Sequence, residues 1–208
     1  MAELMRRRAM MASTSRRIPG MYTELEYLIA PLGAYFQDDF GSEEILNGFS
    51  TKYRITSRPN NWSPYICAGT IKFIPRSQAQ VCINLGSGGD NFINNYKDFS
   101  NLNNDYTVEA NTDGTCKLLS NGNPITTLTV GNRAATEIEI LMQPSDGIVK
   151  FAGRLYWLKL FSSGSCMHEY VPCIRKEDNV VGIYDVMTNK FLTNAGTGTI
   201  TPGPTIGG

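Results

Sequence analysis

The chain has 208 residues and no formal net charge at pH 7, because 19 basic side chains balance 19 acidic ones. Charged residues make up only 18% of the sequence, so the composition gives no field that would attract nucleic acid or an anionic membrane. No stretch approaches the roughly 18 apolar residues of a membrane span, and no apolar run follows the basic start as in a secretory signal. We therefore expect neither nucleic-acid binding nor membrane insertion.

The first 17 residues, MAELMRRRAMMASTSRR, differ from the rest of the chain. They hold five arginines and one glutamate, a charge of +4 that leaves −4 on the remainder. Their good helix formers, without glycine or proline, predict a short helical arm over residues 1–17. The arm is either a frayed basic terminus or a segment that docks on a partner, with methionines in a groove and arginines against acids. The docking residues would be Leu4, Met5, Arg6, Arg7, Arg8, Met10 and Met11.

Residues 18–208 contain short stretches of strand-type sequence separated by turns. Asp113-Gly114 and Asn121-Gly122 are strong hairpin signals, and the acidic residues of 38–44 predict a loop. The expected strands are 21–29, 35–37, 49–57, 66–75, 80–85, 106–110, 115–119, 124–130, 136–143, 154–161, 167–171, 180–184 and 190–193. This spacing predicts an all-β fold, a single two-sheet antiparallel β-sandwich of jelly-roll type.

An aromatic hairpin stands at the centre of this pattern. Alternation in 154–161 predicts two faces, one with Tyr156, Leu158 and Leu160, the other with Leu155, Trp157, Lys159 and Phe161. Apolar residues on both faces indicate a central strand. Gly164 fits the turn that follows, and Pro172 is expected to end the pairing of the returning strand because it has no N–H.

The five cysteines, Cys67, Cys82, Cys116, Cys166 and Cys173, are an odd number without a C-x-x-C pair. We expect free, buried thiols and assembly in a reducing cytoplasm, with a disulfide framework as the alternative.

Several segments resemble the concanavalin A-like (laminin-G-like) jelly-roll modules of phage and prophage structural proteins from gut bacteria. They are YTELEYLIAPLGAYF at 22–36, GRLYWLKLF at 153–161, EYVPC at 169–173 and VVGIYDVMTNKFLTNAGTGT at 180–199. The resemblance implies a lectin/glucanase-type fold and a place in the virion, made and assembled in the host cytoplasm. It predicts a structural protein of the head or a tail fibre, or a decoration protein. Other virion proteins would hold its N-terminal arm, and it would form homo-oligomers.

Catalysis is not expected. Glucanases of this fold use a Glu-x-Asp-x-x-Glu strand, and the pairs Glu24/Glu26 and Glu137/Glu139 lack the third carboxylate. His168 and Glu169 are neighbours in a strand, so they point to opposite faces and cannot form a dyad. With one histidine and no calcium-loop motif, we expect no metal and no cofactor.

Carbohydrate binding is the alternative function, attaching a particle or a cell to host-surface or mucosal glycans. Aromatic rings stack on sugar rings, and the candidates are Trp62 and Tyr65 in a loop, and Trp157 and Phe161 on the concave sheet. The competing interpretation, which we favour from sequence, places Trp157 and Phe161 in the core.

Overall fold

The computed structural model describes residues 17–39, 46–57, 66–68, 71–75, 81–85, 91–93, 102, 104–111, 113–129, 137–140 and 152–207. For the described residues of 66–93 and 137–140, and for 39, 126, 128 and 129, it describes the backbone alone. The predicted docking residues Leu4, Met5, Arg6, Arg7, Arg8, Met10 and Met11 lie outside the described residues, as do Trp62 and Tyr65. The helical arm therefore stays a prediction.

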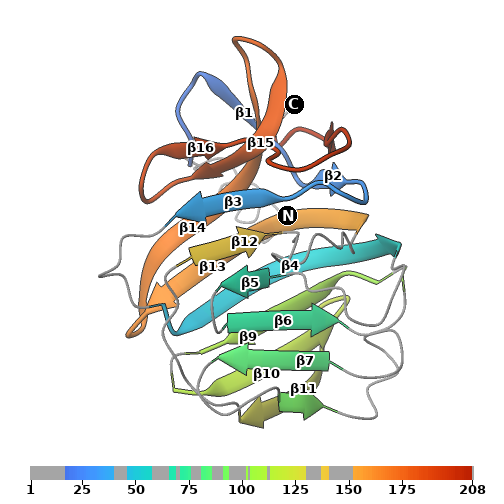
Figure 1. Cartoon of the computed structure of the whole chain (residues 1–208), viewed down its shortest axis with the longest axis vertical. Coiled ribbons are helices and arrows are strands. Elements are labelled where there is room, and N and C mark those ends of the chain that lie inside the picture. Colours follow the sequence, from blue (N-terminus) through green and yellow to red (C-terminus); the bar gives the residue numbers. More distant parts are fainter. Residues whose placement is uncertain are drawn as a thin grey trace, which may run out of the picture.

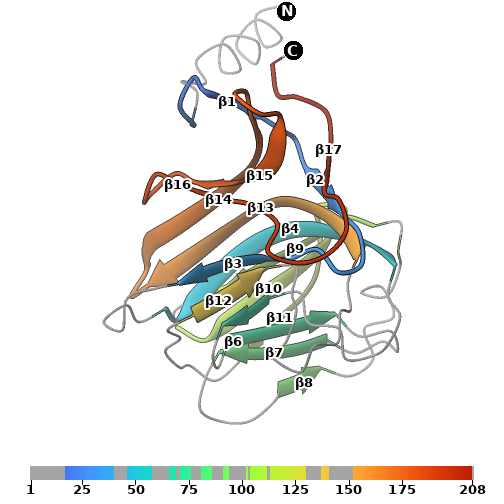
Figure 2. The same cartoon turned by 45° about the horizontal axis from the view of Figure 1, so that its top comes forward.

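Every regular element in the described ranges is a β-strand, and the strands form two antiparallel sheets (Figures 1 and 2). The main path of the large sheet runs β11 (Asn123–Thr129), β10 (Thr115–Ser120), β9 (Tyr106–Ala110), β4 (Gly48–Ser57), β13 (Ala152–Ser162), β14 (Ser165–Arg175), β15 (Val180–Asp185) and β16 (Lys190–Leu192). Three short strands join it: β1 (Tyr22–Glu24) on β14, β2 (Leu28–Ala30) on β13, and β17 (Thr201–Pro202) on β2.

The small sheet lies in front of the large one in Figure 1. Its order is β3 (Phe36–Asp39), β12 (Glu137–Ile140), β5 (Ile66–Ala68), β6 (Ile71–Pro75), β7 (Val81–Leu85) and β8 (Asn91–Ile93). The predicted all-β fold is confirmed, although the predicted strand 66–75 is a hairpin of β5 and β6. No helix long and apolar enough to span a membrane occurs in the described part of the chain.

The core lies between the sheets. Phe36 of β3 is fully buried in one cluster with side chains of the large sheet, including Phe49, Tyr53, Leu158 and Leu160. These residues alternate along β4 and β13 with polar ones, so each strand presents one apolar face to the small sheet. Burial of each such side chain stabilises the fold by about 1.5–3 kcal/mol, which makes this interface the main source of stability.

Turn chemistry agrees with the sequence prediction. Asn121 and Gly122 have positive φ angles of 48° and 80°, as the tight β10–β11 turn requires. Ser163 and Gly164 form a similar turn between β13 and β14, with φ angles of 46° and 84°.

β13 is central, as predicted, but its two faces are not those expected. Leu155 pairs with Tyr53 and Trp157 pairs with Lys52, so Tyr156 is the extra residue of a β-bulge. Leu155, Leu158 and Leu160 therefore belong to the core, and Tyr156 lies with the outward-facing residues. Simple alternation was wrong for Leu155 and Tyr156 because it assumes a strand without a bulge.

The predicted first strand, 21–29, is two strands. β1 pairs with the end of β14, and β2 pairs with the start of β13. A bend at Leu25–Tyr27 separates them, with Leu25 buried and Glu26 exposed. The chain thus changes partner within a few residues, which no local pattern could predict.

Pro172 does not end the returning strand. It pairs with Ile183 inside β14, and its carbonyl accepts a hydrogen bond of 2.9 Å from the Leu25 amide. Nitrogen and carbonyl of one strand residue point to the same side, so the missing N–H faces Leu25 and not β15. The proline therefore costs the β14–β15 ladder no hydrogen bond.

The three described cysteines are free. Cys116 and Cys173 are buried, and burial raises the pKa of each thiol to about 12. Burial also raises the pKa of Cys166. The prediction of free thiols is confirmed for these three, and the side chains of Cys67 and Cys82 lie outside the description.

Candidate functional site

The outward side of the large sheet over β10, β9, β4 and β13, here called the outer face, carries polar and aromatic side chains. Cross-strand pairing aligns Trp157 with Lys52, Lys52 with Thr107, and Thr107 with Leu119. Cross-strand neighbours lie on the same face of a sheet. The residues that follow Lys52 in β4 and Trp157 in β13, Tyr53 and Leu158, belong to the core. The row therefore lies on the side away from the small sheet.

Tyr27 and Tyr156 form a packed pair beside this row. Their ring centroids are 5.2 Å apart in an edge-to-face arrangement. The Lys52 ammonium lies 4.2 Å from the Tyr156 centroid, and the Arg154 guanidinium lies 4.4 Å from the Tyr27 centroid. Each cation is held over the negative face of a ring, which fixes its position without neutralising its charge.

Asp105 is the acidic centre of this group. Its carboxylate accepts a 2.6 Å hydrogen bond from Arg54 and a 2.8 Å bond from the Tyr156 hydroxyl, and Lys52 lies 3.6 Å away. Burial works to raise the pKa of Asp105, but these hydrogen bonds outweigh it and the pKa lies below its usual value. The same bond to Asp105 raises the pKa of Arg54. Asp105 is therefore a stable carboxylate and not a proton donor at neutral pH.

A second ionic group lies at the edge of the outer face. Glu169 of β14 is 3.1 Å from Lys159 and 3.2 Å from Arg17, and Arg17 also donates to Glu24 at 3.0 Å.

Next to this ionic group, the outward side of β14–β16 is apolar, and the chain after Arg17 covers that apolar surface. That covered cluster consists of Ile18, Val171, Cys173 and Tyr184, with Tyr22, Val186 and Phe191 packed against it.

Trp157 and Phe161 both belong to the outer face and not to the core. Each is partly exposed, and neither packs against the described core clusters. The interpretation that we favoured from sequence is therefore wrong, because the residues between them, Leu158 and Leu160, are those that point inward. Trp157 and Phe161 are four residues apart, so their backbone positions lie about 13 Å apart along β13.

His168 is in a second polar cluster, inside the sandwich. Its Nδ1 donates to the Asp185 carboxylate at 2.6 Å, and its ring stacks on Tyr170 with centroids 5.7 Å apart. Tyr170 donates to Asp38 at 2.8 Å, and Lys190 forms an ion pair with the same aspartate. The sequence analysis placed Asp38 in an acidic loop, but this residue is buried in β3. We call these five residues the buried carboxylate cluster.

Asp185 is the most constrained member of the buried carboxylate cluster. Besides His168, its carboxylate accepts hydrogen bonds from the amides of Glu169 and Met187, each 3.0 Å long, and from the Thr188 hydroxyl at 2.6 Å. Burial works to raise the pKa of Asp185, yet these bonds outweigh it and the pKa lies below the ordinary value. Through these hydrogen bonds the Asp185 carboxylate links β14 to the turn between β15 and β16.

Ligand atoms of Asp38, His168 and Asp185 lie within 4.8 Å of one another, the kind of donor set that can hold a metal ion. Here the Lys190 ammonium already supplies positive charge to Asp38, and Asp185 has four hydrogen-bond donors. An ion would have to displace these contacts. The cluster is therefore built as a structural link between β3 and the end of the large sheet.

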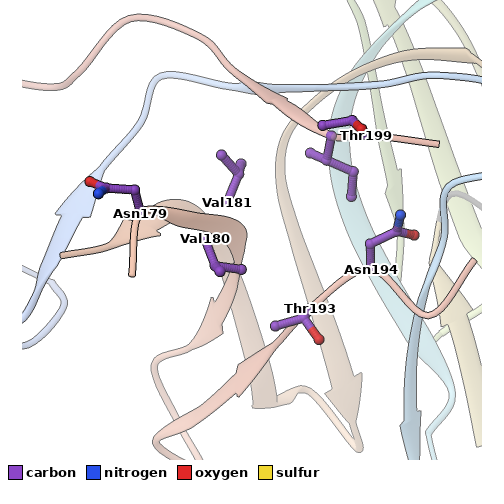
Figure 3. A pocket seen from close by; sticks show the side chains of 7 residues that line it. Asn179, Val180, Val181, Thr193, Asn194 and Thr199 are labelled. Atoms are coloured by element: carbon purple, nitrogen blue, oxygen red, sulfur yellow. The ribbon is translucent and has the colours of Figure 1, made fainter. Parts of the chain in front are cut away.

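A small pocket lies near the C-terminal segment (Figure 3). Its volume is about 340 Å³, and its lining is uncharged: Asn179, Val180, Val181, Thr193, Asn194, Thr199 and Ile200. The Asn194 amide is already committed, because it accepts from the amides of Tyr35 and Gly196 and donates to the Gly198 carbonyl. The pocket thus offers no charged group for a ligand, and its Asn194 amide is held by the chain itself.

The sequence analysis identified Trp157 and Phe161 but missed the groups around them. Tyr27, Arg154 and Tyr156 come together only because β2 pairs with β13 and β13 has a bulge. The Glu24/Glu26 pair is separated by the bend after β1. His168 and Glu169 do point to opposite faces, as predicted, but the partner of His168 is Asp185.

No protein-family model matches the chain, and no curated protein matches it. Among solved structures, the Ruminococcus gnavus IT-sialidase CBM40 is similar, with 13% identity in its complex with alpha2,3 sialyllactose and 12% in a second structure. Each alignment covers 67% of this chain and 90% of the other, with TM-scores of 0.43 and 0.42. A Bacillus licheniformis beta-glucanase aligns with 14% identity over 64% of this chain and 68% of its own, with a TM-score of 0.26. These are distant likenesses between sandwich folds, and the site is argued below from its own geometry.

Proposed function

We propose that this chain is a non-enzymatic carbohydrate-binding module of concanavalin A-like jelly-roll type, and that the glycan binds on the outer face around Trp157. The main observation in support is the partly exposed Trp157 indole, the cross-strand neighbour of Lys52, on a face where Tyr27, Tyr156 and Asp105 hold Arg154, Lys52 and Arg54 in place. A sugar ring presents C–H groups that stack on an aromatic ring and hydroxyls that bond to charged groups around it.

The rigidity of this group favours binding. Lys52 and Arg154 are each held over a ring, and Arg54 is bonded to Asp105, so little side-chain entropy remains to be lost when a ligand arrives. Phe161, further along β13, extends the surface for a longer glycan.

Two carboxylates of the outer face and its edge, Asp105 and Glu169, do not favour hydrolysis. A glycosidase needs one carboxylic acid with a raised pKa, whereas the pKa of Asp105 is lowered and Glu169 is paired with Lys159 and Arg17. The non-enzymatic assignment remains part of the proposal.

A glycan array with the purified full chain tests the function directly. We expect binding that Trp157→Ala weakens at least about fivefold, since stacking contacts of this kind contribute about 1–3 kcal/mol per ring by analogy with base stacking. Leu119→Ala, on the same row but three strands away, is the matched control and should bind normally. An array without a hit, or equal binding by both variants, would contradict the proposal.

The second candidate is the structural protein of a bacteriophage particle suggested by the sequence resemblance, anchored by a helical arm over residues 1–17. One observation favours it: Arg17 pairs with Glu24 and Glu169, which fixes the point where the basic segment joins the sandwich. Deletion of residues 1–16 should leave the melting temperature nearly unchanged and abolish incorporation into particles. Full incorporation of the truncated chain would contradict the anchoring role.

A further inference from the structure

We infer that the glycan of the proposed site is acidic, carrying a carboxylate or a sulfate that binds beside Trp157. This inference rests on the proposed carbohydrate-binding function and specifies its ligand. The full chain is electrically neutral, but the described side chains of the outer face and its edge include six bases and four acids. They are Arg17, Lys52, Arg54, Lys117, Arg154 and Lys159, against Glu24, Asp105, Glu109 and Glu169.

Among these six basic residues, Arg154 is the one that points to a defined site for an anion and not only to a general positive charge. Among the described residues no carboxylate lies within ion-pair distance of its guanidinium, although Arg54 and Lys159 each have one. Its described partner is the Tyr27 ring, whose centroid lies 4.4 Å from the guanidinium. Tyrosines orient a guanidinium but do not neutralise it. Its fork of N–H groups matches a carboxylate or sulfate in geometry as well as charge.

Lys52 adds a second, weakly compensated charge. Its nearest described carboxylate oxygen, on Asp105, is 3.6 Å away, and Asp105 is bonded more closely to Arg54 at 2.6 Å. The Lys52 side chain is 34% exposed and lies on the Tyr156 ring. One carboxylate therefore serves two cations here, and Arg154 next to them has none among the residues that the structure describes.

The position of these cations relative to the indole selects the kind of ligand. Lys52 is the direct cross-strand neighbour of Trp157, and Arg154 pairs with Arg54 on the adjacent row. Cross-strand neighbours lie about 4.5–5.5 Å apart, a separation that one sugar ring with an acidic substituent can span. A neutral sugar would leave the two cations facing its hydroxyls, whereas an acidic one supplies the counter-charge.

Titration calorimetry with three defined oligosaccharides tests this inference. The probes are chitohexaose, which is neutral; a chondroitin hexasaccharide, which carries carboxylates; and its sulfated counterpart. We expect the acidic probes to bind at least tenfold more tightly than chitohexaose, with affinity that falls as salt is raised. The two acidic probes distinguish carboxylate from sulfate as the preferred group.

The variant that matters most is Arg154→Met, which removes the charge and keeps the stem. It should lower affinity for the acidic probes at least tenfold and that for chitohexaose by a much smaller factor, while Arg154→Lys should recover part of the loss. Lys117→Met removes an exposed cation of the same face on β10 and is the matched control. Melting curves of each variant check that it is folded.

The outcomes separate the two proposals. Equal binding of neutral and acidic probes, lost in Trp157→Ala, would overturn the acidic ligand and keep the carbohydrate-binding function. Equal losses in Arg154→Met and Lys117→Met would show diffuse attraction of polyanions and overturn the site. No binding of any probe, together with an empty glycan array, would overturn both.

Discussion

Two aspartates of this molecule have nearly the same partners in opposite surroundings. Asp38 accepts a 2.8 Å hydrogen bond from the Tyr170 hydroxyl and pairs with Lys190, and it is only 3% exposed. Asp105 accepts a 2.8 Å bond from the Tyr156 hydroxyl and pairs with Arg54, but its side chain is 20% exposed.

The difference between them is the role of water. In the interior a lost partner leaves a charge that nothing can solvate, so Asp38 and its neighbours hold β3 against β14–β16. On the outer face water replaces a lost partner at little cost, so the same groups remain available to a ligand. Chemistry alone does not distinguish a structural cluster from a binding site, whereas burial does.

The largest effect should come from Asp185→Ala in the buried carboxylate cluster. It leaves His168 and two backbone amides without their acceptor, and loss of one partner of a buried pair costs about 3–5 kcal/mol. Urea denaturation measures the loss, and Glu177→Ala, in an exposed turn, is the control. A loss below about 1 kcal/mol would show that the cluster is not a structural link.

Leu158→Ala should come next and tests the bulge of β13. Leu158 is fully buried in the core, and truncation of such a leucine costs about 2–5 kcal/mol. Tyr156→Phe removes a hydroxyl on the opposite face and should cost less, because water can take its place at the partly exposed Asp105 carboxylate. Similar losses for the two variants would mean that the faces of β13 are assigned wrongly.

Acid should reveal the electrostatic part of the buried carboxylate cluster. The pKa of Asp185 is lower in the folded chain than its ordinary value of 3.8, so the ionised group stabilises the fold above that value. The contribution is lost as the pH falls through the folded pKa. The stability difference between the wild type and Asp185→Asn should therefore narrow as the pH falls below the ordinary value of 3.8 and through the folded pKa. Urea titrations at several pH values measure it, and a constant difference would contradict the prediction.

The smallest effect should come from Asp105→Asn on the outer face. The partly exposed pair with Arg54 contributes about 1 kcal/mol or less, so the melting temperature should hardly change. The same variant should strengthen binding of the acidic chondroitin probe, because it removes the only described carboxylate paired with Lys52 and Arg54. A large loss of stability would show that Asp105 behaves like its buried counterpart.

Local signals predicted much of the fold. The strand over 106–110 and the Asn121-Gly122 turn needed only alternation and a pair of residues that tolerate positive φ. The β13 bulge and the pairing of Pro172 were missed, because both depend on which strands lie alongside.

The candidate site was predictable only in part, for the same reason. Trp157 could be proposed from its residue type, but Tyr27 and Arg154 meet through strand pairing. Tyr170 and Asp38 are 132 positions apart, so only the completed topology brings them into contact.

The bulge at Tyr156 has a consequence for how β13 can change over evolutionary time. Leu155 and Leu158 point inward on either side of it, so deletion of the Tyr156 codon would leave a regular strand with every core residue in phase. Deletion of one codon at 158, 159 or 160 would instead turn the rest of the strand over. An insertion at this one place could thus add a ring to the outer face without disturbing the core.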